Sequence, residues 1–246
     1  RVASDFRSLA IRMGGVMIKV GQFLSSRLDV LPPEITHELS GLQDEVPAEK
    51  FEDIRSLAEA ELGAPLDELF AAFEEEPVAA ASLGQVHRAV LMGEVVGMEF
   101  SRVVVKVQRP YIEQLIDVDL SALQRFGSWL QRYKPVSKRV NVPGLVEEFA
   151  TITRAEIDYM AEGSNAEKFA KNFAATERVH VPRVVWDKTT LRVLTLEDVV
   201  AIKITDYDAI TAAGIERGSA SRWRRCPSAT ITPGTNERRS SRCHRP

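Results

Sequence analysis

Apolar residues recur at helical spacing along the first 29 residues of the chain. Successive apolar positions lie three or four residues apart, which is the pattern of an amphipathic helix. Gly14-Gly15 interrupts this pattern, so we predict one helix, or two consecutive helices broken at that point. The stripe is expected to face a core. The alternative is a helix lying on a membrane, which a polar face that is not strongly basic disfavours. The stripe comprises Phe6, Leu9, Ala10, Met13, Val16, Met17, Val20, Phe23 and Leu24.

Helical patterns return in six later segments, and proline and glycine mark several of their ends. Pro110 suits the first residue of a helix because the backbone N–H that it lacks is not needed there. The longest segment contains Gly163-Ser164, where we predict an interruption. The predicted helices span residues 34–44, 48–62, 66–73 (one or two turns), 110–133, 143–173 and 205–213.

Three acidic residues lie close together within the segment 143–173. Asp158 and Glu162 are four residues apart and are expected to share one helix face, whereas Glu156 points elsewhere. Acids on a helix are usually solvated surface groups. A buried strand lysine needs a carboxylate partner, however, and this helix follows the predicted strands where it can supply one.

Alternation of apolar and polar positions marks strands in the middle of the chain. In one of them the valines at 103, 105 and 107 occupy one face and Lys106 lies on the other, so this lysine points off the sheet. Residues 92–101 are expected to form a mobile hairpin connection. His87 is interpreted as structural rather than catalytic. The predicted strands span residues 86–91, 102–108, 179–186 and 190–197, with a turn at Asp187-Lys188 in the last pair.

An alanine-rich run before these strands has the spacing of a nucleotide loop. Residues 79–86 follow the protein-kinase template G-x-G-x-x-G-x-V, with alanines in place of the first two glycines and with Gly84 in place of the third. Lys106 then stands where the kinase strand lysine pairs phosphate oxygens and a helix glutamate. Alanine-rich runs more often form helices or small-residue packing. Pro77 and Gly84 disfavour a helix here, which leaves a strand-turn-strand unit as the prediction.

Charge and cysteine are distributed unevenly along the 246 residues. The net charge is −3, but the segment from Gly214 onward holds eight arginines and two acids, which leaves about −9 for residues 1–213 by subtraction. Both cysteines lie in that tail, so the body has no disulfide framework and no cysteine metal site.

No apolar run approaches the ~20 residues of a membrane span. There is no signal peptide, and a start at Arg1 rather than methionine indicates a fragment.

Residues 214–246 differ from the rest of the chain in composition. Arginine, serine, threonine and proline dominate there, and no periodic apolar pattern is present, so we predict disorder. A basic tail can bind nucleic acid. The more economical interpretation is a reading frame or gene model that departs from the native one near residues 214–218, and no nucleic-acid partner is expected.

Five ordered motifs together resemble one family, the UbiB/AarF-like atypical kinases, which are linked to ubiquinone and other prenyl-lipid metabolism. The resemblance covers about residues 1–213. Its motifs are K-x-G-Q at Lys19, Gly21 and Gln22, the alanine-rich loop at Ala79, Ala80, Ala81 and Ser82, the strand lysine Lys106, E-x-D at Glu156 and Asp158, and the helix glutamate Glu162.

The resemblance implies an α+β fold in which a helical, family-specific extension precedes a kinase-like N-lobe of antiparallel sheet plus helix. The implied domains are residues 1–76 for the extension, 77–213 for the N-lobe to hinge and the start of a C-lobe, and 214–246 for the tail. ATP or ADP would be bound, with Mg²⁺ expected only for the full-length family. Lys19 and Gln22 would lie over the nucleotide and meet Glu156 and Asp158. Residues 194–198 resemble the hinge, with Glu197 in the adenine-binding segment.

The implied nucleotide-binding residues are Ala79, Ala80, Ala81, Ser82, Gly84, Lys106, Glu162 and Glu197. The residues implied over the site are Lys19, Gly21, Gln22, Glu156 and Asp158. No H-x-D-x-x-x-x-N or D-F-G segment follows Glu197, so we assign no catalytic and no metal-binding residue and expect the chain alone to be inactive. A non-catalytic nucleotide- or lipid-binding regulator, or an unstable gene fragment, are the alternatives. A prenyl lipid or a membrane surface is a further candidate partner, and the expected location is cytoplasmic, with peripheral membrane attachment as a variant.

Overall fold

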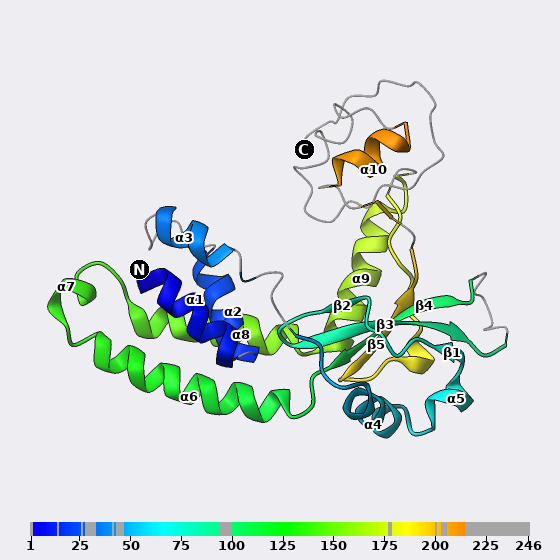
Figure 1. The fold of residues 1–246 in the computed structure, drawn as a ribbon, viewed down its shortest axis with the longest axis horizontal. Coiled ribbons are helices and arrows are strands. Elements are labelled where there is room, and N and C mark those ends of the chain that lie inside the picture. The colour runs from blue at the N-terminus through cyan, green and yellow to red at the C-terminus, as the bar shows by residue number, and fades with distance from the viewer. Residues whose placement is uncertain are drawn as a thin grey trace. The chain divides into compact units, whose positions relative to one another are not determined.

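The computed structural model describes residues 2–13, 15–25, 27, 33–40, 42, 47–93, 100–176, 179–199, 201–202 and 206–214 (Figure 1). The predictions for residues 215–246, and for the part of the hairpin connection at 94–99, lie outside these residues. The described chain forms two compact units. The first comprises Arg1–Glu167 with Arg183–Asp198, and the second comprises Lys168–Pro182 with Val199–Pro246.

The first region contains three helices, and the first two are separated at the predicted glycine break, since one ends at Met13 and the next begins at Gly15. The helices are α1 (Val2–Met13), α2 (Gly15–Ser25) and α3 (Pro33–Ser40). Helix α2 is buried on two sides. Ile18 packs with Ala10 and Leu39 of the other two helices, whereas Val16 packs against α6 (Ile112–Leu130) and α8 (Val142–Glu156). The predicted stripe is therefore wrong in part, because Ile18 is buried and Leu9 is exposed.

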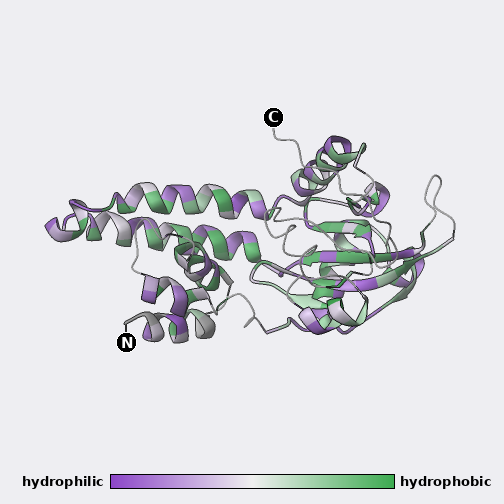
Figure 2. Ribbon diagram, turned by 90° about the horizontal axis from the view of Figure 1, so that it is seen from above, coloured by the Kyte–Doolittle hydropathy of each residue, from purple (hydrophilic) through white to green (hydrophobic). Residues whose placement is uncertain are grey.

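The first unit also contains a five-stranded antiparallel sheet. Its strand order is β1-β3-β4-β5, and β2 pairs with the same central strand β3. The strands are β1 (Phe70–Phe73), β2 (Ala79–Ala80), β3 (Gly84–Leu91), β4 (Arg102–Gln108) and β5 (Val193–Glu197). Figure 2 shows green, apolar positions alternating with purple, hydrophilic ones along the strands of the sheet, as expected of strands that contribute one face to a core.

The two faces of the sheet are covered as the alternation in β4 predicts. Val103, Val105 and Val107 are fully buried against Ile54 and Ala58 of α4 (Phe51–Leu62). Lys106 lies on the opposite face, where the first half of α9 (Tyr159–Phe173) packs through Tyr159 against Leu194 of β5. Lys106 thus projects toward α9.

Several predicted elements differ from the observed ones. The segment 66–73 is a single helical turn, α5 (Leu66–Leu69), followed by strand β1. Pro110 precedes α6 rather than starting it. The predicted strand 179–186 forms only an isolated bridge between Val184 and Leu196, and η2 (Trp186–Lys188) follows it. The short helices are α7 (Lys134–Ser137) and, in the second unit, α10 (Tyr207–Ala212), which lies within the predicted segment 205–213.

The predicted long helix is two helices, and the break is not at the glycine. α8 ends at Glu156 and α9 begins at Tyr159, so the interruption falls at residues 157–158. Gly163 lies inside α9, where a Cβ would come within 2.9 Å of the Trp186 ring and 3.4 Å of Leu194. Glycine is therefore required there for close packing of the helix on β5 and η2.

None of the described helices is both long enough and apolar enough to cross a membrane.

His87 is part of a buried polar chain that joins three segments. Its Nδ1 lies 2.8 Å from the carbonyl oxygen of Glu74, which can only accept, so Nδ1 donates. Its Nε2 lies 2.9 Å from Nε2 of Gln85, whose Oε1 accepts from the backbone N–H of Glu49 at 2.9 Å. These contacts hold His87 as the neutral Nδ1–H tautomer, and its role is structural.

Acid pH is expected to destabilise the protein through His87. Burial lowers the pKa of His87 below its ordinary value, although the hydrogen bond to Glu74 opposes this shift. Just below pH ~6.5 the unfolded chain therefore binds more protons than the folded chain. The free energy of unfolding falls as the pH drops from there toward the pKa of His87 in the folded protein. The slope reaches at most about 1.4 kcal/mol per pH unit for one proton.

Urea unfolding at neutral pH and near pH ~5.5 measures this effect. In His87→Gln the part of the pH dependence that belongs to this residue should disappear. His37→Gln, which changes an exposed histidine, is the matched control and should keep the wild-type slope. Identical slopes in wild type and His87→Gln would contradict the assignment.

Candidate functional site

The alanine-rich run forms an edge strand and a tight turn. Ala79 pairs with Val86 and Ala80 pairs with Gln85, and the backbone N–H of Ala81 donates to Gly84 O at 2.8 Å. The turn itself consists of residues 82 and 83, which are both buried. The strand-turn-strand prediction is confirmed, and the helical alternative is excluded.

Gly84 is required for packing rather than for an unusual backbone angle. Its φ does not lie in the positive range, and a Cβ at this position would come within 2.7 Å of Val107 O and 2.5 Å of the Tyr159 hydroxyl. Glycine in a nucleotide loop often allows a positive φ, and that is not the reason for glycine here. Gly84 instead lets the turn lie directly on β4 and α9.

We expect Gly84→Ala to lower the free energy of unfolding by roughly 1–3 kcal/mol, because the added methyl group cannot move a backbone carbonyl cheaply. Chemical denaturation measures the loss. Tyr159→Phe is the companion variant, since its hydroxyl has no hydrogen-bond partner among the described residues. The double variant removes one of the two clashes and should recover part of the stability. A Gly84→Ala protein as stable as wild type would contradict this account.

Lys106 and Glu162 form the central ion pair of the site. The Lys106 ammonium lies 2.9 Å from Oε1 and 2.7 Å from Oε2 of Glu162, so it donates to both carboxylate oxygens. The same ammonium lies 4.4 Å from the centre of the Tyr159 ring, a cation–π distance. Lys106 is cross-strand neighbour to Val86 and Leu194, which places it between the alanine-rich hairpin and β5. The pair that the family resemblance implied is present.

The pair is only partly buried. The side chains of Lys106 and Glu162 are 29% and 42% exposed, so water screens the charge left behind when one partner is removed. A cost of about 3 kcal/mol for losing one partner applies to buried pairs. Because the Lys106–Glu162 pair is partly exposed, we expect the loss of one partner to lower the free energy of unfolding by less than about 1 kcal/mol. Lys106 is therefore better suited to a functional than to a structural role.

Tyr159 and Gln108 form the floor beneath this pair. Burial raises the pKa of Tyr159, and the neighbouring carboxylates of Glu162 and Glu156 raise it further, so the phenol stays neutral. Gln108 donates through Nε2 to Ile157 O at 2.5 Å and to Leu191 O at 3.3 Å. Its Oε1 and the Tyr159 hydroxyl are both buried without a hydrogen-bond partner among the described residues. Gln108 thereby attaches the α8–α9 junction to β4.

The K-x-G-Q and E-x-D motifs meet through one residue of each. Lys19 of α2 lies 2.6 Å from Oε1 and 2.5 Å from Oε2 of Glu156, at the end of α8. Gln22 instead donates to Leu42 O at 3.3 Å, and no contact of it with these acids is observed among the described residues. Gly21 is buried in α2 between them.

Asp158 has a local structural role that differs from the prediction. Its Oδ1 accepts the backbone N–H of Ala161 at 2.9 Å, and its carbonyl oxygen accepts that of Glu162 at 3.0 Å, so it caps the start of α9. It therefore does not share a helix face with Glu162, because it precedes the helix. The cap fixes the start of the helix that carries Glu162 one turn later.

Glu197 lies away from Lys106 along the strand. It pairs with Val103, three residues from Lys106, which corresponds to about 10 Å of strand. Its side chain accepts from Arg183 N at 3.2 Å, and its own N–H donates to Arg183 O at 2.9 Å. Any contribution of this segment to adenine binding remains a prediction.

Arg109 is the residue that sequence reasoning missed. It is 8% exposed, its backbone N–H donates to Leu83 O and its Nε to Ala81 O, both at 3.0 Å. Its guanidinium also donates to Pro47 O at 2.6 Å and to the Glu49 carboxylate. One side chain thus ties both ends of the turn to the segment that enters α4. A lone arginine before a proline gave no signal of this role.

The described residues contain no group of three or more metal-ligating His, Cys, Asp or Glu side chains. The groups that fit a nucleotide phosphate are Lys106, which has a third N–H donor beyond the two used by Glu162, and the backbone of the alanine-rich hairpin above it.

Comparison with known proteins shows similarity over most of the chain. Residues 41–223 match the model of the ABC1 atypical kinase-like domain. The chain is 45% identical over 216 residues to the protein ACTIVITY OF BC1 COMPLEX KINASE 7, chloroplastic, of Arabidopsis thaliana, covering 87% of this chain and 30% of that protein. It is 37% identical over 221 residues to the probable protein kinase UbiB of Xanthomonas campestris, covering 88% and 40%.

A solved structure is similar as well. Rv3197 of Mycobacterium tuberculosis, determined as a complex with erythromycin, superposes with a TM-score of 0.53 at 28% sequence identity, over 79% of this chain and 47% of Rv3197. The chain spans 30% and 40% of the length of the two relatives named above. The similarity therefore concerns less than half of the length of each of these proteins.

Proposed function

Because this chain belongs to the ABC1 atypical kinase-like family, we propose that it binds an adenine nucleotide, ATP or ADP, between the alanine-rich hairpin and Lys106. One observation carries the proposal. The Lys106–Glu162 pair lies beside the hairpin on the face of β4 toward α9, partly open to solvent, with Tyr159 beneath it. This is the arrangement that positions a lysine for phosphate oxygens in kinases.

Each group has a distinct task in this proposal. Lys106 contacts phosphate oxygens, and Glu162 holds its ammonium in place from α9. Ala79, Ala80, Ala81 and Ser82 supply a hairpin whose small side chains allow the nucleotide to approach, and Gly84 seats that hairpin on the sheet. Residues 194–198, which resemble the hinge, would contact adenine. Lys19 of the helical extension, paired with Glu156 of α8, and Asp158 at the start of α9 border the site.

The longer relatives suggest the wider role. Homologues named UbiB favour a role in prenyl-lipid metabolism of the ubiquinone type, with a prenyl lipid as a candidate partner. Mg²⁺, when bound with the nucleotide in the full-length family, would neutralise charge on the phosphates. The Arabidopsis relatives are named chloroplastic, which adds organelles to the expected cytoplasmic location. The compartment of this chain stays a prediction.

Equilibrium binding of ATP and ADP to the purified chain, with and without Mg²⁺, tests the proposal. We expect saturable binding that adenine nucleotides displace and inorganic phosphate does not. We also expect no hydrolysis by the chain alone. Absence of saturable binding by a folded protein would refute the nucleotide site. Mg²⁺-dependent hydrolysis that Lys106→Ala abolishes would leave that site standing and overturn the expected inactivity.

A further inference from the structure

An exposed apolar stripe runs along α6 on a side that does not face its core. Ile112, Ile116 and Leu120 are buried, and they define the core-facing side. With a rotation of about 100° per residue, the exposed apolar side chains of α6 fall within an arc of about 80°, and this arc does not overlap the core-facing side of the helix. These side chains are Leu115, Val118, Phe126 and Trp129, and the exposed Tyr111 and Tyr133 flank the helix just before its start and shortly after its end. The C-terminal half of this stripe is entirely aromatic.

The same end of the helix is strongly basic. Residues 120–146 contain five basic side chains and no acid. All five are exposed, and none forms an ion pair with any residue that the structure describes. By contrast, two of the three acids in the first half of α6 are paired, Asp117 with Arg154 and Glu113 with Arg192, and the third is Asp119. The tip surface, as we name it, comprises Arg125, Phe126, Trp129, Arg132, Tyr133, Lys134, Lys138 and Arg139.

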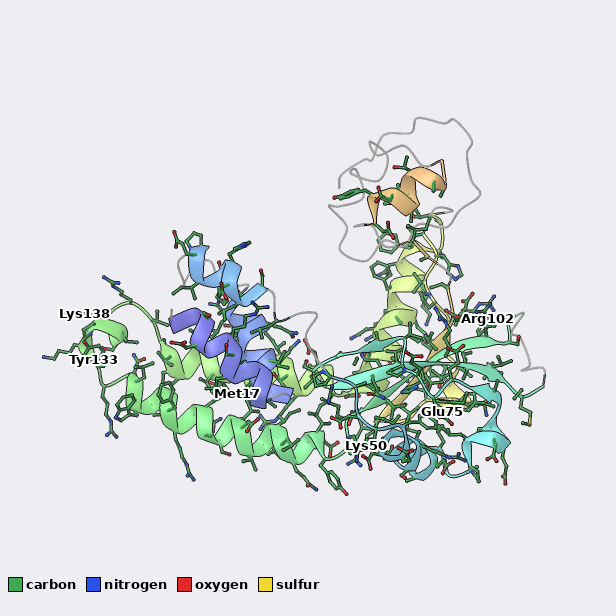
Figure 3. All side chains as sticks on the ribbon, viewed as in Figure 1. Met17, Lys50, Glu75, Arg102, Tyr133 and Lys138 are labelled. Atoms are coloured by element: carbon green, nitrogen blue, oxygen red, sulfur yellow. The ribbon has the colours of Figure 1, made fainter. Side chains whose placement is uncertain are left out.

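The tip surface lies where α6, α7 and α8 turn back on themselves. Helices α6 and α8 run side by side in Figures 1 and 2, and α7 lies at the end of this helical hairpin. In Figure 3 the labelled Tyr133 and Lys138 both lie at that end, far from Glu75 and Arg102 of the sheet region. Gly127 of α6 seats the two helices together, because Val142 and Val146 lie 3.3 Å from the position of a Cβ. The surface thus sits on a rigid support.

A shallow hollow at the tip surface is suited to an anionic headgroup. It has a volume of about 500 Å³, is open to solvent, and is lined by Arg125, Arg132 and Trp129 among others. Ser121, Gln124 and Ser128 complete its lining with hydroxyl and amide groups. Two guanidinium groups and several neutral donors are the groups that bind a phosphate diester.

We propose that the tip surface docks this protein on an anionic lipid bilayer. Trp129 and Tyr133 are 63% and 61% exposed, and such amphipathic rings are stabilised at the level of lipid headgroups. The five basic side chains are attracted to anionic phospholipid, each strengthening binding about fivefold. Lipid, unlike a nucleic acid, also accepts the aliphatic part of the stripe at Leu115 and Val118.

A second copy of the chain is a poorer partner for this surface. Isologous pairing would bring five unneutralised cations of each protomer together, and like charges repel. The lipid proposal is independent of the nucleotide site, since it rests on a different helix and its test needs no nucleotide.

Co-sedimentation of the full chain with vesicles tests the proposal. We expect binding to vesicles of phosphatidylcholine with phosphatidylglycerol, little binding to phosphatidylcholine alone, and release by salt. Reversing two charges, in Arg125→Glu with Arg132→Glu, should weaken binding on the order of thirtyfold or more. Brominated acyl chains should quench the emission of Trp129, and Trp129→Phe should remove that quenching.

Matched variants away from the tip surface serve as controls. Lys50→Glu reverses an exposed charge beside α4, and Met92→Ser removes an exposed apolar side chain after β3. Both should bind vesicles as wild type does. Equal binding to neutral and anionic vesicles, or unchanged binding of the double charge reversal, would overturn the proposal. So would duplex DNA binding or dimerisation that depends on the same arginines without vesicle binding.

Discussion

Arg109→Met is expected to lower the free energy of unfolding by roughly 3 kcal/mol, the largest loss of stability that we predict for a single substitution. The guanidinium is almost fully buried, and its removal leaves Ala81 O and Pro47 O without their donor. The Glu49 carboxylate loses its partner as well, although this side chain is 37% exposed and water compensates part of that loss. Chemical denaturation of the purified chain measures the change.

Two further variants separate burial from charge. Arg109→Lys retains the charge but has a single nitrogen, which cannot reach three separated acceptors, so an intermediate loss is expected. Arg154→Met removes an exposed arginine whose pair with Asp117 is 3.2 Å long and well solvated, and it should change stability by less than about 1 kcal/mol. Arg109→Met and Arg154→Met with equal stability would show that Arg109 does not hold the turn.

Lys106→Met is expected to weaken ATP binding on the order of 10- to 100-fold, because charge-assisted contacts to phosphate are lost. The stability of the protein should fall by less than about 1 kcal/mol, since the Lys106–Glu162 pair is half-exposed. Isothermal titration with ATP and chemical denaturation of the same preparation separate these two effects. The predicted signature is a large change in affinity at nearly constant stability.

Glu162→Gln provides the companion measurement. It removes the charge that orients the Lys106 ammonium and retains the size of the side chain, so a smaller loss of affinity is expected. Lys50→Met, an exposed lysine outside the site, is the matched control and should bind ATP as wild type does. If Lys106→Met bound ATP normally, the nucleotide would have to lie elsewhere. If the Lys106→Met protein did not fold, the Lys106–Glu162 pair would be needed for stability.

Local periodicity determined the elements that carry the site. The alternation in residues 102–108 placed Lys106 opposite three core valines, and it did so correctly because a strand side chain has only two faces to choose from. Pro77 and Gly84 excluded a helix through the alanine-rich run for equally local reasons. The order of the motifs along the chain was sufficient to indicate the family.

Contacts between distant segments could not be predicted in this way. Asp158 was assigned to a helix face, but the chain breaks at residues 157–158 and uses Asp158 as a cap, where Gln108 also holds Ile157 O. Gly163 was read as a breaker because its packing partner Trp186 is remote in sequence. In each case the sequence shows the residue type but not the group that the residue contacts in the fold.

The sequence by itself determined strands β3, β4 and β5, the outward direction of Lys106 and the family to which the chain belongs, because these depend on spacing and on short motifs. Only the tertiary structure decided that Glu162 reaches Lys106, that Arg109 fastens the turn and that Gly84 is needed against Tyr159. The physical reason is that burial and hydrogen bonding are satisfied between segments tens of residues apart. The spacing of residues along the chain does not predict which distant group a side chain will contact.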